Sequence, residues 1–199
     1  MRIPQNARRA AVPIALLAAW AGLAGPSTAS AQAPGAPGAA RAGGITVLVV
    51  PVAGMTCALC TRGVEQSIKL LDTVVAASAE LSTGLVRVQA VDGKSLNIHD
   101  VKDRVQKAGF RIGGECDVEA VGRFVLGPDG RITFRIPGTV YAFQVLEGSE
   151  LKRLFRTRPG LKGDFFLQFR LHEHPRWKPP AISIVRAEPR VAAATATGR

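Results

Sequence analysis

The order of the hydrophobic patterns between residues 44 and 116 constrains the fold of this 199-residue chain more than any other feature. Runs of β-branched residues predict strands, and apolar residues spaced three or four apart predict helices. The patterns predict, in order, a strand at 45–52, a helix from Cys60 to 71, strands at 74–81 and 85–91, a helix from Asn97 to 108, and a strand at 110–112. The order β-α-β-β-α-β is the split β-α-β arrangement, with antiparallel strands and both helices on one face of the sheet.

Residues 117–188 predict a second domain that is mostly β. Short strands are predicted at 122–126, 132–136, 140–145, 164–171 and 181–186, with a helix at 147–156. Five strands with a helix between the third and the fourth is the element order of an OB-fold barrel. We therefore expect a small OB-like barrel on element order alone, joined to the first domain by a short connection at 115–121.

The amino terminus carries the pattern of an export signal. Arg8 and Arg9 precede an apolar run at 10–24, which is shorter than the roughly 20 residues of a membrane-spanning helix. Small residues follow in two A-x-A patterns, which predict cleavage after Ala31 or Ala33. We expect the mature protein to be periplasmic or secreted.

The order of elements makes the first domain α+β and ferredoxin-like. The two ends of the chain have a different composition from the two domains. A stretch rich in Ala, Pro and Gly after the signal predicts a flexible leader, and an Ala- and Thr-rich end predicts a disordered tail. The expected segments are a signal peptide at 1–31, the leader at 32–43, the ferredoxin-like domain at 44–116, the OB-like domain at 117–188 and the tail at 189–199.

Composition limits the chemistry that this chain can carry. Three cysteines are too few for a disulfide scaffold, and three histidines with two methionines exclude a metal sponge rich in either residue. The net charge of +11 suits a solvated surface, an acidic partner or peripheral contact with an anionic membrane. Because an exported protein meets little nucleic acid, we expect no nucleic-acid partner. The sequence shows no Ser-His-Asp set, no paired carboxylates and no phosphate loop, so we expect no enzyme.

The residues with the most specific chemistry lie at the start of the first predicted helix, in Gly54-Met55-Thr56-Cys57-Ala58-Leu59-Cys60. Two thiols three residues apart can converge on one ion there, and the positive end of the helix favours the thiolate form. Two sulfurs without a nearby His or carboxylate suit a soft ion such as Cu(I) or Hg(II), whereas structural Zn(II) takes four ligands. Thiol–disulfide redox motifs have the same spacing, so the spacing alone leaves that function open.

The run from Gly54 to Cys60, with the helical spacing that follows it, resembles the heavy-metal-associated domain. That family includes copper chaperones, the amino-terminal modules of copper-transporting P-type ATPases and a periplasmic mercury-binding protein. The resemblance covers about residues 44–116. It implies that Cys57 and Cys60 bind the ion, that Met55 packs beneath the loop, and that Phe110 lies beside it.

The expected function is therefore binding and transfer of a soft metal, with Cu(I) favoured, through Cys57 and Cys60. The expected partner is a metal-donating or metal-accepting protein such as a copper transporter. Three alternatives stay open: capture of Hg(II), redox chemistry by the same cysteines, and an adaptor whose OB-like domain docks on a membrane complex. In an oxidising compartment the unmetallated cysteines are at risk of forming a disulfide.

Three further residues carry weaker expectations. Cys116 is expected at the end of the sheet far from the metal loop, as a buried and inert thiol rather than a third ligand. His172 and His174 lie at strand spacing, which puts both imidazoles on one side, where they could hold Cu(II) or Zn(II). A plain surface strand end before Pro175 is the favoured interpretation of this pair.

Overall fold

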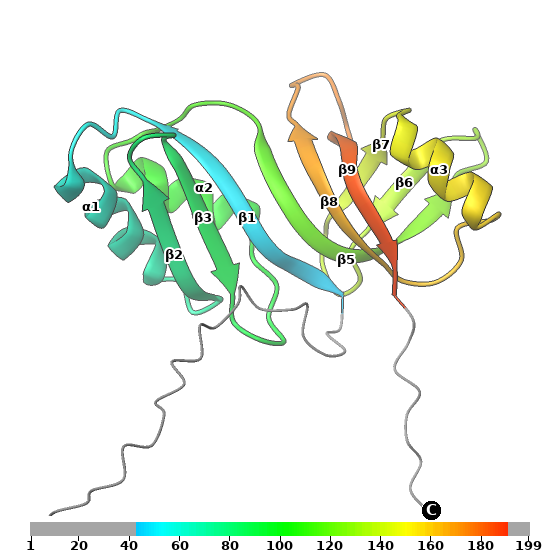
Figure 1. Cartoon of the computed structure of the whole chain (residues 1–199), viewed down its shortest axis with the longest axis horizontal. Helices are drawn as coiled ribbons and strands as arrows, with labels where there is room; N and C mark the ends of the chain where they lie inside the picture. Colours follow the sequence, from blue (N-terminus) through cyan, green and yellow to red (C-terminus); the bar gives the residue numbers. More distant parts are fainter. Residues whose placement is uncertain (1–42, 191–199) are drawn as a thin grey trace, which may run out of the picture. The chain divides into compact units, whose positions relative to one another are not determined.

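The computed structural model describes residues 43–190 (Figure 1). The predicted signal peptide, the leader up to residue 42 and the tail from residue 191 lie outside the described residues. Within residues 43–190, no helix combines the length and the apolar character that crossing a membrane requires.

The first half of the described chain follows the predicted order of elements. Its elements are β1 Gly44–Ala53, α1 Ala58–Lys69, β2 Val74–Glu80, β3 Leu85–Ala90, α2 Ile98–Lys107 and β4 Arg111–Ile112. β1 pairs with β3, and β3 pairs with β2, all antiparallel. Asn97 caps α2 through its side-chain oxygen, which accepts the His99 N–H at 3.0 Å. The local patterns therefore predicted the elements of this half correctly.

The second half forms a β barrel with one helix. Its elements are β5 Cys116–Leu126, β6 Ile132–Arg135, β7 Ala142–Val145, α3 Ser149–Thr157, β8 Phe165–His172 and β9 Ala181–Pro189. The strands pair in the order β5-β6-β7-β9-β8, and β8 pairs back onto β5, so the five strands close on themselves. Only the contact between β7 and β9 is parallel among these described pairs. The protein is thus a mixed α/β structure that includes a barrel.

One strand belongs to both halves. β5 pairs along one edge with β1, from Asp117 opposite Val49 to Val121 opposite Gly44. Along its other edge β5 pairs with β8, so that one sheet of nine strands runs through the described residues. The boundary expected between residues 116 and 117 falls at the start of this shared strand.

The expectation that residues 115–121 form a connection, with the next strand starting at Gly122, was wrong. Apolar and acidic residues alternate along this stretch, and Cys116, Val118 and Ala120 are buried, which is a strand pattern. The two glycines at 113–114 separate β4 from β5, and such a glycine pair indicates the end of a strand in the sequence. β4 itself has only two residues, so β5 supplies most of the fourth strand of that sheet.

Gly122 is the point at which β5 enters the aromatic core of the barrel. Phe134, Phe143 and Phe169 are buried there, with the ring of Phe169 lying 6.0 Å from that of Phe134 and 5.4 Å from that of Phe143. A β-carbon on Gly122 would lie 2.4 Å from the Arg135 carbonyl oxygen and 2.7 Å from Phe134 Cζ. Because no side chain fits within those distances, this position requires glycine.

Gly122→Ala should therefore lower the free energy of unfolding by about 1–3 kcal/mol, because the added methyl group overpacks the barrel. Gly63→Ala is the matched control. Gly63 lies inside α1, where a β-carbon meets nothing within 4 Å, so alanine should raise stability there by about 0.5–1 kcal/mol. Urea unfolding of both variants measures the two effects, and unchanged stability in Gly122→Ala would contradict the close approach.

Candidate metal centre

The two cysteines of the predicted site lie where the loop after β1 leads into α1. The loop begins at Gly54, whose φ of +99° lies in the left-handed region that glycine adopts without strain. Met55 follows and is buried in the core, with 8% of its surface exposed. Thr56 and Cys57 are exposed. The buried methionine therefore anchors a loop whose next residues face solvent.

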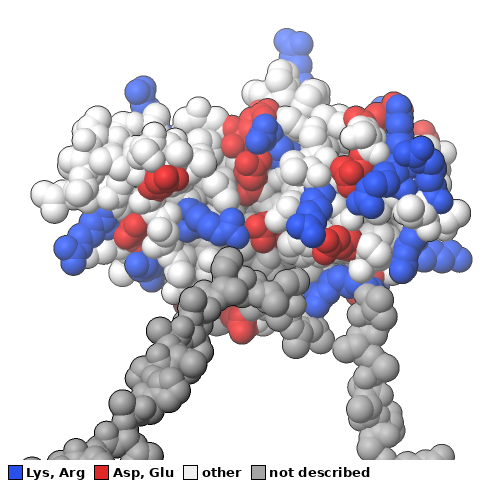
Figure 2. Space-filling view, in the orientation of Figure 1, with Lys and Arg blue, Asp and Glu red and all other residues white. Residues whose placement is uncertain are grey.

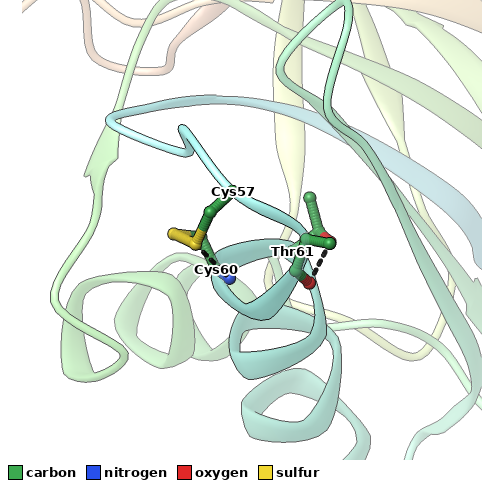
Figure 3. Close-up of a disulfide and its surroundings, with 4 residues drawn as sticks. Cys57, Cys60 and Thr61 are labelled. Atoms are coloured by element: carbon green, nitrogen blue, oxygen red, sulfur yellow. Dashed lines mark hydrogen bonds between the residues drawn. A yellow bond between two sulfur atoms is a disulfide. The ribbon is translucent and has the colours of Figure 1, made fainter.

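Cys57 is the N-cap of α1 (Figure 3). Its backbone is extended, and its Sγ accepts a hydrogen bond from the Cys60 N–H at 3.2 Å. Its carbonyl oxygen accepts the N–H groups of Cys60 and Thr61, at 3.0 and 3.2 Å. Thr61 Oγ1 donates to the Ala58 carbonyl oxygen at 2.8 Å, a contact that was not foreseen from the sequence. These bonds fix the first turn of the helix and with it the direction of both cysteine side chains.

The sulfurs of Cys57 and Cys60 are joined as a disulfide in this structure (Figure 3). The same spacing leaves two thiols on one side of the first turn when the disulfide is reduced. The helix dipole at the start of α1 favours negative charge there. The first turn contains no acidic side chain to oppose that charge. Reduction would therefore leave two soft sulfur atoms close together at the positive end of the helix.

In residues 43–190, no His, Asp, Glu or other Cys side chain joins the pair as a third ligand. Among residues 43–190, no group of three or more His, Cys, Asp or Glu side chains is placed to share a metal ion. Phe110 is partly buried against the core, and its Cδ1 lies 3.8 Å from where a β-carbon on Gly54 would be. Met55 and Phe110 therefore lie beneath and beside the loop, although their part in metal binding stays a prediction.

Cys116 is separate from this pair. It is the first residue of β5, and its neighbour Asp117 pairs with Val49, five residues or roughly 16 Å of strand before the loop. Cys116 is 1% exposed and is not in a disulfide. Burial raises the pKa of its thiol to about 11, although the Lys102 cation opposes the shift. The thiol is therefore protonated at neutral pH, and a protonated thiol is a poor metal ligand.

The predicted histidine pair lies at the end of β8 and just beyond it. His172 Nδ1 is 2.5 Å from Glu115 Oε1, and its Nε2 is 2.7 Å from Ser183 Oγ. His174 Nδ1 accepts the Arg176 N–H at 3.2 Å. Because both ring nitrogens of His172 already have protein partners, these contacts do not favour a second metal site, which stays a prediction.

Comparison with known proteins places the likeness in the first half of the chain. Residues 49–111 match the heavy-metal-associated domain. Copper chaperone CopZ of Staphylococcus aureus is 31% identical over 64 residues, which are 32% of this chain and 93% of the relative. A solved CopZ metallochaperone is 28% identical over 34% of this chain and 98% of its own, with a TM-score of 0.32. A copper-binding domain of a P-type ATPase is 29% identical over 37% of this chain and 92% of its own, also with a TM-score of 0.32.

Alkylation by iodoacetamide should distinguish the three cysteines. At pH 7.5 the reduced and folded chain should gain two adducts, on Cys57 and Cys60, whereas the oxidised chain should gain none. Cys116 should react only in denaturant, because burial excludes the reagent and a pKa of about 11 leaves little thiolate. Intact-mass measurement and peptide mapping give the count and the positions. Rapid labelling of Cys116 in the folded chain would contradict this assignment.

Proposed function

The chain belongs to the heavy-metal-associated domain family, and we propose that it binds Cu(I) through Cys57 and Cys60 and passes the ion to a partner protein. The observation that carries this proposal is the placement of both sulfurs on the first turn of α1, with Cys57 as the N-cap. The curated relatives are named as copper chaperones, which supports copper as the cargo.

The donor set favours Cu(I) over harder ions. Thiolates are soft ligands, and two of them satisfy an ion of low coordination number, whereas structural Zn(II) takes four protein ligands. The carboxylates and imidazoles that would complete a zinc site do not gather in the described part of the chain. Hg(II) shares the preference for two sulfurs and is the runner-up cargo for the same cysteines.

Loading begins with reduction of the Cys57–Cys60 disulfide. A dithiol reductant gives two electrons and two protons to the S–S bond and is itself oxidised to a disulfide. Cu(I) then binds as the two thiols lose their protons. Transfer follows when a thiolate of the partner replaces a thiolate of this chain on the ion, so that delivery involves no net oxidation or reduction.

Exposed residues around the cysteines provide the first contact with a partner. Leu59 lies between the cysteines and exposes 79% of its surface, and Arg62 is exposed on the next turn. An apolar side chain beside a cation is complementary to a partner surface that carries an apolar patch and a carboxylate. The proposed partner is a metal-donating or metal-accepting protein such as a copper transporter.

The proposed location is the periplasm or the extracellular space. Support comes from the sequence, in which Arg8 and Arg9 precede a short apolar run and a small-residue cleavage pattern. An oxidising compartment would also favour the disulfide form of the site until a reductant arrives.

We propose that the barrel is an OB-like module that binds a partner or a surface. Its five strands close with α3 between the third and the fourth strand, which is the element order of the OB fold. The family of the first half supplies metal-binding modules, and we assign no enzymatic activity to either half.

Thiol–disulfide exchange is the second candidate function, and the Cys57–Cys60 disulfide is the observation in its favour. The N-cap position of Cys57 stabilises its thiolate, which would make it a good leaving group. Cys57 is exposed whereas Cys60 is partly buried, so the sulfur of Cys57 would meet the substrate.

The reduced chain should bind one Cu(I), because the two thiolates form a single site. Cys57→Ser should weaken binding by more than about 100-fold, since losing one of two ligands exceeds the 10–100-fold effect of lost outer contacts. Competition against a chromogenic Cu(I) chelator, in the presence of reductant, measures both the affinity and the stoichiometry.

Cys116→Ala is the matched control for this experiment, because it removes the buried thiol and leaves the first turn of α1 intact. Its Cu(I) affinity should stay within about twofold of that of the unsubstituted chain. Undiminished affinity in a Cys57→Ser, Cys60→Ser double variant would overturn the site. The preference for Hg(II) over Cu(I) is measured for this chain and for the CopZ chaperone in the same assay. A larger preference for Hg(II) in this chain than in CopZ would favour the runner-up cargo.

Reduction of insulin disulfides should separate a carrier from a redox protein. A carrier should give no turnover above the uncatalysed reaction, because its cysteines exchange a metal ion rather than electrons. Turnover that disappears in Cys57→Ser and persists in Cys116→Ala would favour the second candidate.

A further inference from the structure

Helix α3 and the loop after it expose four cations besides Arg153, which is paired with Glu150. Lys152 and Arg156 lie on the helix, Arg158 lies at its end, and Lys162 lies in the loop. None of the four forms an ion pair with another residue in the described range 43–190. Figure 2 shows Lys and Arg side chains gathered over this helix. These four residues form the basic face of the barrel.

The acidic residue of α3 does not neutralise the basic face. Glu150 is bound to Arg153, whose Nη2 lies 2.7 Å from its Oε2. The hydrogen bond from Arg153 lowers the pKa of Glu150, so this carboxylate is ionised and already paired at neutral pH. Glu147, which lines the same pocket as Lys152, and Glu188, which acts on Arg153, are the other carboxylates near α3, so cations outnumber acids there.

Exposed apolar side chains lie beside the basic face. Phe155, on α3, is 39% exposed, and Leu126, at the end of β5, is 69% exposed. Leu126 pairs with Ile132, and Ile132, Arg131 and Phe155 line one pocket of about 430 Å³. Exposed aliphatic and aromatic residues next to cations are typical of contact with a membrane interface.

We propose that the basic face, together with Phe155 and Leu126, docks on the surface of an anionic phospholipid bilayer. The cations attract the lipid phosphates, and the two apolar side chains enter the interface. A symmetric dimer through this surface is disfavoured, because two basic faces repel each other. Nucleic acid would neutralise the cations but would leave the aliphatic side chain of Leu126 without a partner, so a lipid surface accounts for more of the observations.

Docking through α3 leaves the metal loop free. α3 packs against β9, whereas the loop extends from β1, and β5 and β8 lie between those two strands. A bilayer contact on the barrel would thus bring the cysteines close to membrane proteins without covering them. The proposal concerns the barrel alone and does not depend on which metal the cysteines bind.

Sedimentation with lipid vesicles tests the proposal on the full chain. The chain should bind vesicles of equal parts phosphatidylglycerol and phosphatidylcholine at least about tenfold more tightly than vesicles of phosphatidylcholine alone. The difference should disappear as salt rises from about 0.1 M to about 1 M, because the Debye length falls from about 10 Å to about 3 Å. Any binding by the apolar run at 10–24 is the same in all variants, so the salt-sensitive affinity is the readout.

Lys152→Glu with Arg156→Glu should lower the salt-sensitive affinity by about tenfold or more. The matched control is Lys69→Glu with Lys107→Glu, which makes the same change in charge on exposed lysines of α1 and α2 and should cost less than about threefold. Leu126→Ser should weaken binding by about threefold to tenfold and leave its salt dependence unchanged, because it removes only apolar contact.

Circular dichroism establishes that each variant is folded before its binding is compared. Equal loss of affinity in the two double variants would show a response to net charge alone and would overturn the docking surface. Tighter binding to a single-stranded oligonucleotide than to the anionic vesicles would assign the basic face to nucleic acid instead.

Discussion

The backbone pairing of β5 on both of its edges is the constraint on which the rest of the structure depends. The metal half is the part of the chain from residue 44 to residue 112. β4 is too short to form the fourth strand of its sheet, so β5 pairs with β1 in that position. An open edge there would expose a row of unpaired N–H and C=O groups, but β8 covers it. The first strand of the barrel and the last strand of the metal half are therefore one strand, and neither half can turn without breaking ladder hydrogen bonds.

Side chains extend this coupling from the sheet to the helices. Tyr141, from the barrel, accepts the N–H of Ile98 at 2.9 Å and donates to Asn97 Oδ1 at 2.7 Å, so the barrel contributes to the cap of α2. Burial raises the pKa of Tyr141, which keeps its hydroxyl protonated and able to donate. Lys102 on α2 pairs with Glu173 after β8. Because α2 contacts both α1 and β4, the barrel helps to orient the elements beside the metal loop.

Much of the fold could be predicted because its signals are local. The β-branched run of β1, the apolar spacing of α1 and the Asn97 cap each specify an element from its own residues. The pairing of β5 with both β1 and β8 could not be predicted in this way, because the residues from 116 to 121 do not specify which strands they pair with. Those partners lie 45 to 77 positions away in the chain, from Phe166 opposite Val121 to Gly44 opposite Val121. Likewise the hydroxyl of Tyr141 gives no sign in the sequence that it will cap a helix of the other half.

The candidate metal site shows the same division between local and distant information. Cys57 and Cys60 could be singled out because four consecutive residues at a helix start contain the whole proposed donor set. What the sequence left open was their oxidation state, which depends on the compartment, and the N-cap role of Cys57, for which Ser, Thr, Asp and Asn are the usual residues.

The two proposed activities depend on separate residues of the chain. Within residues 43–190, the barrel supplies no donor to the proposed metal site, and residues 44–112 supply no residue to the basic face of α3. Substitutions that alter metal preference therefore leave the docking surface unchanged, and substitutions on α3 leave the sulfurs in place. The shared strand β5 nevertheless fixes one with respect to the other through continuous pairing from β1 to β9. In this arrangement the loop with Cys57 and Cys60 keeps a fixed orientation relative to the barrel while the barrel binds its proposed surface.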